Sequence, residues 1–177
     1  SGSNNRVLAS DGSATINQIS SSSVFPAGHV IQIVDPTPVV ETNSLTETYL
    51  NLHEVSITLE GGSSKILIFH EFQGRAATST GVGQRVYKKV GASGVQTSDT
   101  AVFTLGAADS AGPLGNYYNS ETFFTSSNFI VDDASSHNAG NTVYYGFFYR
   151  RRSGSADIPI NQPTDGYFKT TLLEISG

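Results

Sequence analysis

The chain has 177 residues, a formal net charge of −5 and no cysteine, methionine or tryptophan. Without cysteine there is no disulfide framework, thiolate metal site or thiol nucleophile, and an acidic chain is a poor match for general nucleic-acid binding, which needs basic surface against phosphate. No apolar run approaches the ~20 residues of a membrane span, so we expect neither nucleic acid nor membrane insertion. Only 14% of the residues are charged, which is typical of an extracellular β protein that stays soluble through hydroxyl and amide groups.

Residues 1–24 differ from the rest of the chain. Ser1-Gly2-Ser3, without an initiator methionine, indicates a fragment that begins with a cloning scar. The following residues have few apolar side chains and end in the serine run Ser20–Ser23, so the segment cannot bury enough apolar surface alone. We expect either a flexible linker or a neck that orders only around copies of itself. The domain proper is expected to span residues 25–177.

In that domain, period-two alternation dominates, and few windows have the spacing of an amphipathic helix. Short strands between loops rich in glycine, serine and asparagine are typical of sandwiches and jelly rolls. The sequence therefore predicts an all-β fold, an antiparallel jelly-roll-like β-sandwich of about eight strands. The expected strands are His29–Val34, His53–Glu60, Lys65–Phe72, Gln84–Val90, Thr100–Leu105, Glu121–Val131, Thr142–Arg151 and Gly166–Ile175.

Three strands and two glycine segments carry more detailed expectations. His53–Glu60 alternates strictly, which predicts one solvent-facing side. Lys65–Phe72 is apolar on both faces at its start, as in a central strand covered on both sides. Val143–Tyr149 has aromatic residues on both faces, so we expect one face in the core and the other against another subunit. Gly81–Gly83 and Gly91–Gly94 lack the features of a phosphate loop and are expected to be hairpin turns.

No catalytic arrangement stands out, so we do not expect an enzyme, and we expect no cofactor or metal. Glycoside hydrolysis needs two facing carboxylates, and sequence spacing alone pairs none of the candidates. Asp132 and Asp133 are expected to be solvated loop carboxylates or part of an Asx turn. The alternative is a loop cation site that includes His137. The carboxylates considered are Asp132, Asp133, Asp157, Asp165 and Glu174.

The four histidines, His29, His53, His70 and His137, have no metal-binding spacing. His53 and His70 lie on apolar strand faces, where the ordinary interpretation is a core or interface histidine with one satisfied ring nitrogen. The alternative is a ring of three copies of one histidine around an ion, which the symmetry of a trimer makes available.

Two segments are candidate recognition sites. Asn116, Tyr117, Tyr118 and Asn119 fall in an expected loop. Tyrosine offers a flat stacking face and asparagine adds donors and acceptors, a combination that suits carbohydrate or protein contacts. The alternative is that the tyrosine rings pack at the sandwich edge or between subunits.

The second candidate is Arg150-Arg151-Arg152, the densest positive charge in the chain. One interpretation is a solvated strand end that pairs with nearby carboxylates. The other is that Arg151 and Arg152 contact an anionic surface glycan, such as a lipopolysaccharide phosphate, through paired hydrogen bonds.

The order of several segments resembles one family, the C-terminal domains of bacteriophage tail-fibre and virion structural proteins, especially of marine phages. Pro26–Val34 is similar to its PAGxVLQVV opening, and Val55–Leu59 with Ser63–Ile68 is similar to its VSITP…SSKILV segment. The resemblance covers residues 25–177 in consistent order. Further similar segments are Arg85–Lys89 with an RLVRG-like strand, Lys169–Gly177 with a terminal xLTLMEIAG, and Val7–Ser13 with the LxSDGSG segments of fibre shafts.

The resemblance implies a trimeric tip domain on an upstream fibre shaft, located in the virion and extracellular when it acts. Its implied role is trimerisation and binding of a host receptor, a cell-surface glycan or an outer-membrane component. The alternatives are a structural cap or decoration domain that binds no receptor and, third, an enzyme that degrades capsular polysaccharide. Asn116–Asn119 and Arg150–Arg152 match nothing in the family, so the resemblance does not give the ligand.

Overall fold

The computed structural model describes residues 6–10, 16–20, 27–38, 43–76, 80–103, 116–118, 122–133, 137–153, 159–160 and 167–177. Within these ranges all strand pairs are antiparallel and no helix occurs, so no helix there could span a membrane. The expected all-β fold is confirmed.

One layer of the domain is built on β6 (Lys65–Ala76). This strand pairs with β10 (Thr122–Asp132) on one side and with β13 (Lys169–Ile175) on the other. β13 pairs in turn with β3 (Val30–Val34), which ends before Asp35-Pro36 as expected. On the same side of β6 as β13, but beyond the residue where β13 begins, β6 pairs with the short strand β12 (Pro159–Ile160). β12 pairs in turn with β4 (Asn43–Ser44). The main order is therefore β10–β6–β13–β3.

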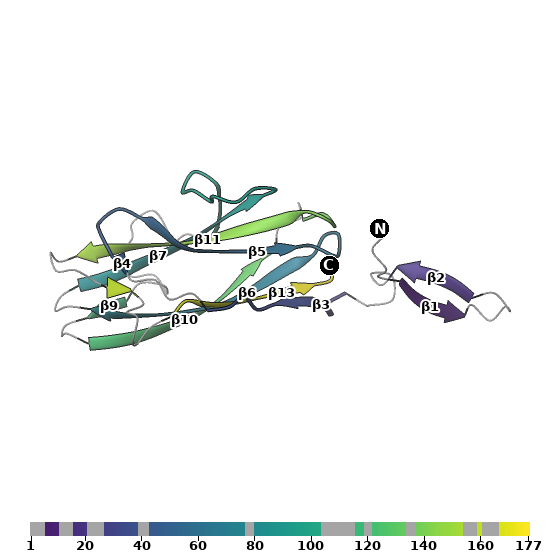
Figure 1. Ribbon diagram of the computed structural model, residues 1–177, viewed down its shortest axis with the longest axis horizontal. Coiled ribbons are helices and arrows are strands. Elements are labelled where there is room, and N and C mark those ends of the chain that lie inside the picture. Colours follow the sequence, from purple (N-terminus) through teal and green to yellow (C-terminus); the bar gives the residue numbers. More distant parts are fainter. Residues whose placement is uncertain are drawn as a thin grey trace.

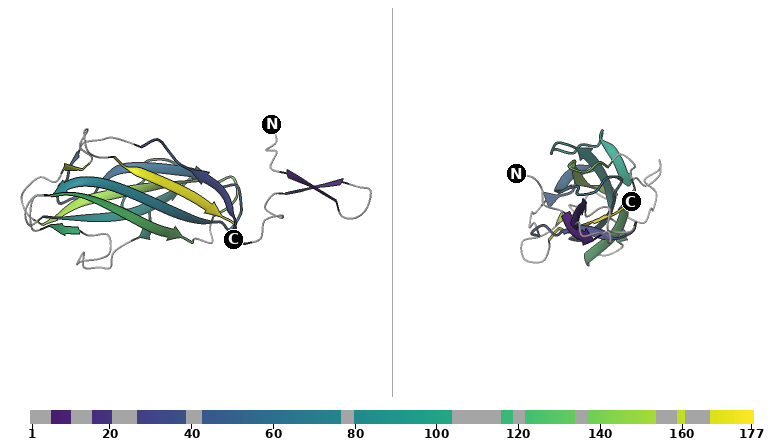
Figure 2. Two further views of the ribbon diagram at one scale, coloured as in Figure 1. Left: turned by 90° about the horizontal axis from the view of Figure 1, so that it is seen from below. Right: turned by 90° about the vertical axis from the view of Figure 1, so that its right-hand side faces the viewer.

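The other layer is built on β11 (Thr142–Ser153), which lies between β5 (Leu50–Thr58) and β7 (Thr80–Val90). On its other side, β7 pairs with two strands. The end of β7 pairs with β8 (Thr100–Phe103), and the start of β7 pairs with β9 (Asn116–Tyr118). Figure 1 shows this layer above β6, β10 and β13, and Figure 2 shows the strands running along the long axis. The expected antiparallel β-sandwich is confirmed.

The two layers enclose an apolar core that follows the predicted alternation. In β5, His53, Val55 and Ile57 are buried, whereas Thr58 on the opposite face is exposed. Successive side chains of a strand point to opposite faces, so the register read from the sequence is correct for this strand. Further buried residues include Ile66, Ile68, Phe72, Val86, Phe147, Tyr149, Phe168 and Leu172.

The second face of β11 is covered at Phe148 by the chain itself, so this side chain does not need the subunit contact that was expected of it. Phe148 is buried against the rings and methyl groups of Tyr87 and Val95, which form a small second core with it. The carboxylate of Glu54 accepts a hydrogen bond of 2.8 Å from the Val95 backbone N–H and holds the loop after β7 on the sheet. Gly146 makes room, because a Cβ there would lie 2.8 Å from the Val95 Cβ.

Other details differ from the expectation. Gly81–Gly83 lies inside β7 and not in a turn, because its backbone pairs with both β11 and β9. Gly91 and Gly94 do lie in the β7–β8 connection, with φ of 85° and 78°. In the segment 1–24, β1 (Arg6–Ser10) and β2 (Ile16–Ser20) pair as an antiparallel hairpin that the sequence pattern did not predict.

Candidate functional site

The outer face of the β10–β6–β13–β3 sheet carries an apolar row. Cross-strand partners lie on the same face of a sheet. The register pairs Val131 with Leu67, Leu67 with Leu173, and Leu173 with Ile33, so each of the four strands contributes one apolar residue. Ile33 and Val131 are strongly exposed, and Leu67 and Leu173 are partly so.

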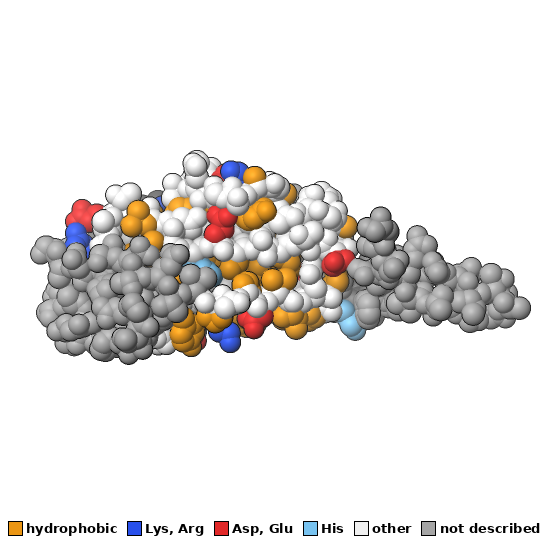
Figure 3. Space-filling view, in the orientation of Figure 1, with side chains coloured by type: hydrophobic (Ala, Val, Ile, Leu, Met, Phe, Trp, Pro, Cys, Tyr) orange, Lys and Arg blue, Asp and Glu red, His pale blue; other side chains and the backbone are white. Residues whose placement is uncertain are grey.

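A pair of aromatic side chains extends this row. Phe69 of β6 and Phe129 of β10 are cross-strand partners whose ring centroids lie 4.9 Å apart, and they are 45% and 57% exposed. Beside them is an open depression of about 410 Å³, to which Thr171 of β13 contributes. We call the two rows together the apolar band; its members are Ile33, Leu67, Phe69, Phe129, Val131 and Leu173. Figure 3 shows hydrophobic side chains along the lower edge of the molecule, beneath this sheet.

Polar residues of both signs flank the apolar band. At one end, Lys65 and Asp133 form an exposed ion pair of 3.0 Å. At the other end, Glu71 accepts hydrogen bonds from Ser127 at 3.2 Å and Tyr167 at 2.9 Å, and its cross-strand partner is the exposed Lys169. An apolar centre inside a polar rim is the usual anatomy of a protein–protein interface.

The expectation that Lys65–Phe72 is covered on both faces is wrong for its outer face. Its inward side chains, Ile66, Ile68 and His70, are buried as expected. Its outward side chains are not covered within one chain, since Leu67 is only partly buried and Phe69 is half exposed. The strand is thus apolar on both faces, but only its inward face is covered within one chain.

The expected recognition loop is partly a strand. Asn116, Tyr117 and Tyr118 form β9, because their backbone pairs with the start of β7 at Thr80–Val82. The prediction of a loop is therefore wrong for these three residues. Asn119 and the side chains of β9 lie outside the described part of the chain.

The arginine run is part of β11, which continues to Ser153. The guanidinium of Arg151 lies 3.8 Å from the Glu47 carboxylate and its side chain is 16% exposed, so pairing with a nearby carboxylate is confirmed for it. Arg150 lies over the Tyr49 ring at 4.9 Å from its centroid. The side chain of Arg152 lies outside the described residues.

The register brings the two candidate segments together. Val82 of β7 has Arg151 of β11 as its partner on one side and Asn116 of β9 on the other. This end of the sandwich lies opposite the end where β3 begins, because β3 starts beside the end of β13, and Glu174 there contacts the turn after β5. No local pattern indicates this juxtaposition, since the two segments are far apart along the chain.

Asp132 is not a solvated loop carboxylate, so that expectation is wrong. It is the last residue of β10 and is buried, and Lys88 Nζ donates to both of its oxygens at 2.7 and 2.8 Å. Tyr145 OH donates to Oδ2 at 2.8 Å, and His137 Nε2 lies 3.2 Å from the same oxygen. Asp132 and His137 do come together, as the alternative of a cation site requires, but the cation between them is the ammonium group of Lys88. Among the described residues no cluster of three or more His, Asp or Glu could hold a metal ion.

The protonation of this cluster follows from its contacts. Burial raises the pKa of Asp132, but hydrogen bonds from His137 and Lys88 outweigh burial and keep that pKa below its ordinary value. The hydrogen bond to Asp132 in turn raises the pKa of His137, against the effect of burial. Asp132 is therefore the anion of the cluster.

The other candidate carboxylates do not form a catalytic pair. Asp133 is held by Lys65. Glu174 is buried and accepts hydrogen bonds from the Gly61 N–H at 2.8 Å and the Ser64 hydroxyl at 2.6 Å, which ties β13 to the β5–β6 turn. Asp157 and Asp165 lie outside the described residues.

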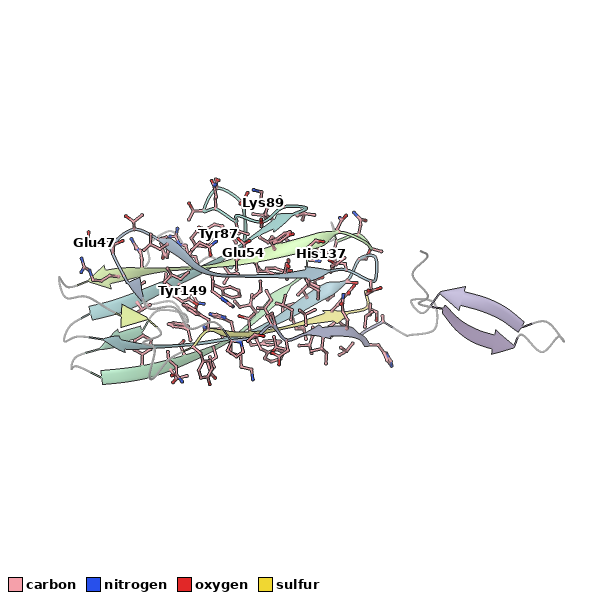
Figure 4. All side chains as sticks on the ribbon, in the orientation of Figure 1. Glu47, Glu54, Tyr87, Lys89, His137 and Tyr149 are labelled. Atoms are coloured by element: carbon pink, nitrogen blue, oxygen red, sulfur yellow. The ribbon has the colours of Figure 1, made fainter. Side chains whose placement is uncertain are left out.

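His53 and His70 are core histidines, as the ordinary interpretation expected. Thr170 Oγ1 lies 2.9 Å from His53 Nε2 and 2.7 Å from His70 Nδ1, and the other ring nitrogen of His70 bonds to Tyr149 OH. Their burial, and that of His137, rules these three out for an ion site on a threefold axis, while His29 is exposed. Figure 4 shows Tyr149 and His137 between the two layers.

We expect acid to destabilise the fold through these histidines. Burial lowers the pKa of His53 from 6.5 to about 4 and that of His70 well below 6.5. Between these values the unfolded chain binds a proton that the folded chain does not, so stability falls as pH drops below 6.5. His137, with its raised pKa, opposes this in part. For His53 alone the loss between about pH 7 and about pH 5 is on the order of 2 kcal/mol.

The measurement is the urea midpoint at the two pH values. His53→Gln keeps a hydrogen-bonding group but does not titrate, so it should flatten the pH dependence. His29→Gln, at an exposed position, should leave it as in the wild type. An equal pH slope in His53→Gln and wild type would contradict a neutral, buried His53.

Comparison with known proteins does not assign the chain to a family. No family model matches the chain, and no curated protein matches it. Among solved structures the chain is similar to one of infectious bursal disease virus, Gx strain, with 12% identity and a TM-score of 0.46. The match covers 97% of this chain and 38% of the viral one, so the chain spans less than half the length of that protein.

Proposed function

We propose that this chain is the tip domain of a bacteriophage tail fibre, a virion component that trimerises and binds a receptor on the host cell. The observation that carries the proposal is the apolar band, which crosses all four strands of one sheet and is uncovered within one chain. Soluble monomers rarely expose contiguous apolar patches of large size. Further copies of this chain are the proposed cover.

The strand order supports a jelly roll, the finer fold expected from the sequence. The eight main strands in chain order are β3, β5, β6, β7, β8, β10, β11 and β13. Counted in that order, one sheet runs 1-8-3-6 and the other 2-7-4-5. Successive strands thus alternate between sheets for most of the chain, as in a double Greek key, an architecture found in viral capsid and lectin domains.

The rim of the apolar band supports self-association. Both signs of charge lie on one face, with the Lys65–Asp133 pair at one end and Glu71 and Lys169 at the other. A closed symmetric assembly requires a surface that can meet a copy of the same chain, and mixed charges can be matched in such a contact. Three copies would present three identical receptor sites, so weak single-site binding would be amplified.

The receptor surface in this proposal is the end of the sandwich that holds β9 and the end of β11. A shaft attached upstream of β3 would reach the opposite end, so β9 would be distal to the shaft. Asn116, Tyr117, Tyr118 and Asn119 would contact a surface glycan or an outer-membrane component, with Arg152 as a second contact. Arg151, already paired with Glu47, would position the patch.

A Tyr117→Ala/Tyr118→Ala variant is the test of this surface. It should remain trimeric with a melting temperature near that of the wild type and lose adhesion to host cells, because two stacking faces would be removed from the proposed receptor surface. The readout is binding of labelled protein to cells, with light scattering as the control. Loss of the trimer would assign the tyrosines to structure, and full adhesion would exclude them from the site. A wild-type trimer that binds no host cells would favour the structural cap or decoration domain.

A further inference from the structure

Lys88 and Asp132 form a buried contact that connects the two sheets. Lys88 lies on β7 of one sheet and Asp132 ends β10 of the other, and both side chains are 6% exposed. Nζ is within 2.8 Å of both carboxylate oxygens, so it also lies against the carboxyl carbon. Taking such a pair out of water costs free energy that an ion pair only partly recovers. The contact therefore places an amine and a carboxyl group together where water is scarce.

His137 is placed to move protons between these two groups. Its Nδ1 lies 2.8 Å from the Ser64 carbonyl oxygen, which can only accept, so Nδ1 carries a hydrogen. In the neutral ring the lone pair is then on Nε2, which lies 3.1 Å from Lys88 Nζ and 3.2 Å from Asp132 Oδ2. These distances suit a group that takes a proton from the amine and delivers it to the carboxylate.

Tyr145 completes the arrangement. Its hydroxyl donates to Asp132 Oδ2 at 2.8 Å, and burial raises the pKa of this phenol, so the phenol stays protonated and remains a donor. A donor fixed on that oxygen draws electron density from the carboxyl group, so the carboxyl carbon is more electrophilic and Oδ2 departs more easily. An amine, a carboxyl group, a proton carrier and a donor on the leaving oxygen thus meet in one buried cluster.

We propose that Lys88 and Asp132 condense to an intramolecular isopeptide bond. The Nζ–Cγ bond forms and the Cγ–Oδ2 bond breaks. Two of the three ammonium protons pass through His137 to Oδ2, which leaves as water. The step needs no oxidant, reductant or cofactor, and the pair has zero net charge before and after. Because the fold holds the amine beside the carboxyl group, the entropic part of the activation barrier is reduced, as in other intramolecular reactions.

The bond would give this cysteine-free chain a covalent link between its sheets. The two residues are 44 positions apart, so the link would close a loop that includes β8 and β9 and restrict the unfolded chain as a disulfide does. The two charges that are now buried would be removed by the same step.

Intact mass spectrometry of the denatured wild-type protein tests the proposal. The mass should be one water molecule below that of the 18.7 kDa sequence, and fragmentation should recover a branched peptide that joins Lys88 to Asp132. A protein at full sequence mass would overturn the proposal. So would a water loss that maps to Asp11 or Asp165, which precede glycine and can form succinimides.

Matched variants identify the groups. Lys88→Arg keeps the positive charge and should restore the full mass. Lys65→Arg, in the exposed pair with Asp133, should keep the loss of water. His137→Gln should slow the reaction, so that freshly purified protein contains a fraction without the bond. A loss of water that persists in Lys88→Arg would contradict the assignment. If a variant fails to fold, the mass of the wild-type protein remains decisive.

Discussion

Ile57→Asp is expected to abolish folding. Ile57 is 1% exposed, lies in β5 opposite Val143 of β11, and belongs to the main core. An unpaired carboxylate at this position costs several kcal/mol, and removal of the side chain from the core adds a cavity cost of about 2–5 kcal/mol. Together these match the total stability of about 5–15 kcal/mol that is usual for a folded domain.

The yield of soluble protein and its far-UV circular dichroism measure this effect. Thr58→Asp is the matched control, because the next residue of β5 points to the exposed face. It should fold with a melting temperature close to that of the wild type. Soluble Ile57→Asp protein with unchanged melting would mean that the register of β5 is wrong.

Phe69→Lys/Phe129→Lys is expected to convert the assembled protein to folded monomers. The two rings are the aromatic members of the apolar band, on β6 and β10, and both are about half exposed in one chain. Two ammonium groups per chain in the proposed subunit contact would be desolvated and would repel their symmetry copies, which costs several kcal/mol. The single chain loses little, since these side chains contribute only partly to its own packing.

Sedimentation velocity with circular dichroism separates these effects. Val90→Lys is the matched control, because Val90 is 46% exposed but lies on β7 of the other sheet. It should leave the assembly intact. A double lysine variant that remains assembled would place the subunit contact elsewhere, and one that unfolds would assign the two rings to the fold.

Local patterns were sufficient to predict the eight main strands and much of the core. The alternation in His53–Glu60 gave the correct inward face, and the all-β class followed from short strands separated by turn residues. The buried positions of His53 and His70 were also expected, because both lie on apolar faces.

What the sequence could not give depends on contacts between distant segments. Nothing local shows that Val95 folds onto β11 over Gly146, so the sequence pattern could not predict that the chain itself covers Phe148. The same holds for Asp132, whose neighbour Lys88 comes from the opposite sheet. Edge pairing of β9 likewise depends on where β7 begins. The uncovered apolar band became visible only when the register of four strands was known.

The mass of the wild-type assembly in solution tests the central claim most directly. Light scattering at micromolar concentration should give three times the 18.7 kDa mass of one chain. A stable monomer at that concentration would contradict the proposal that the apolar band is the contact between the subunits of a trimeric fibre tip.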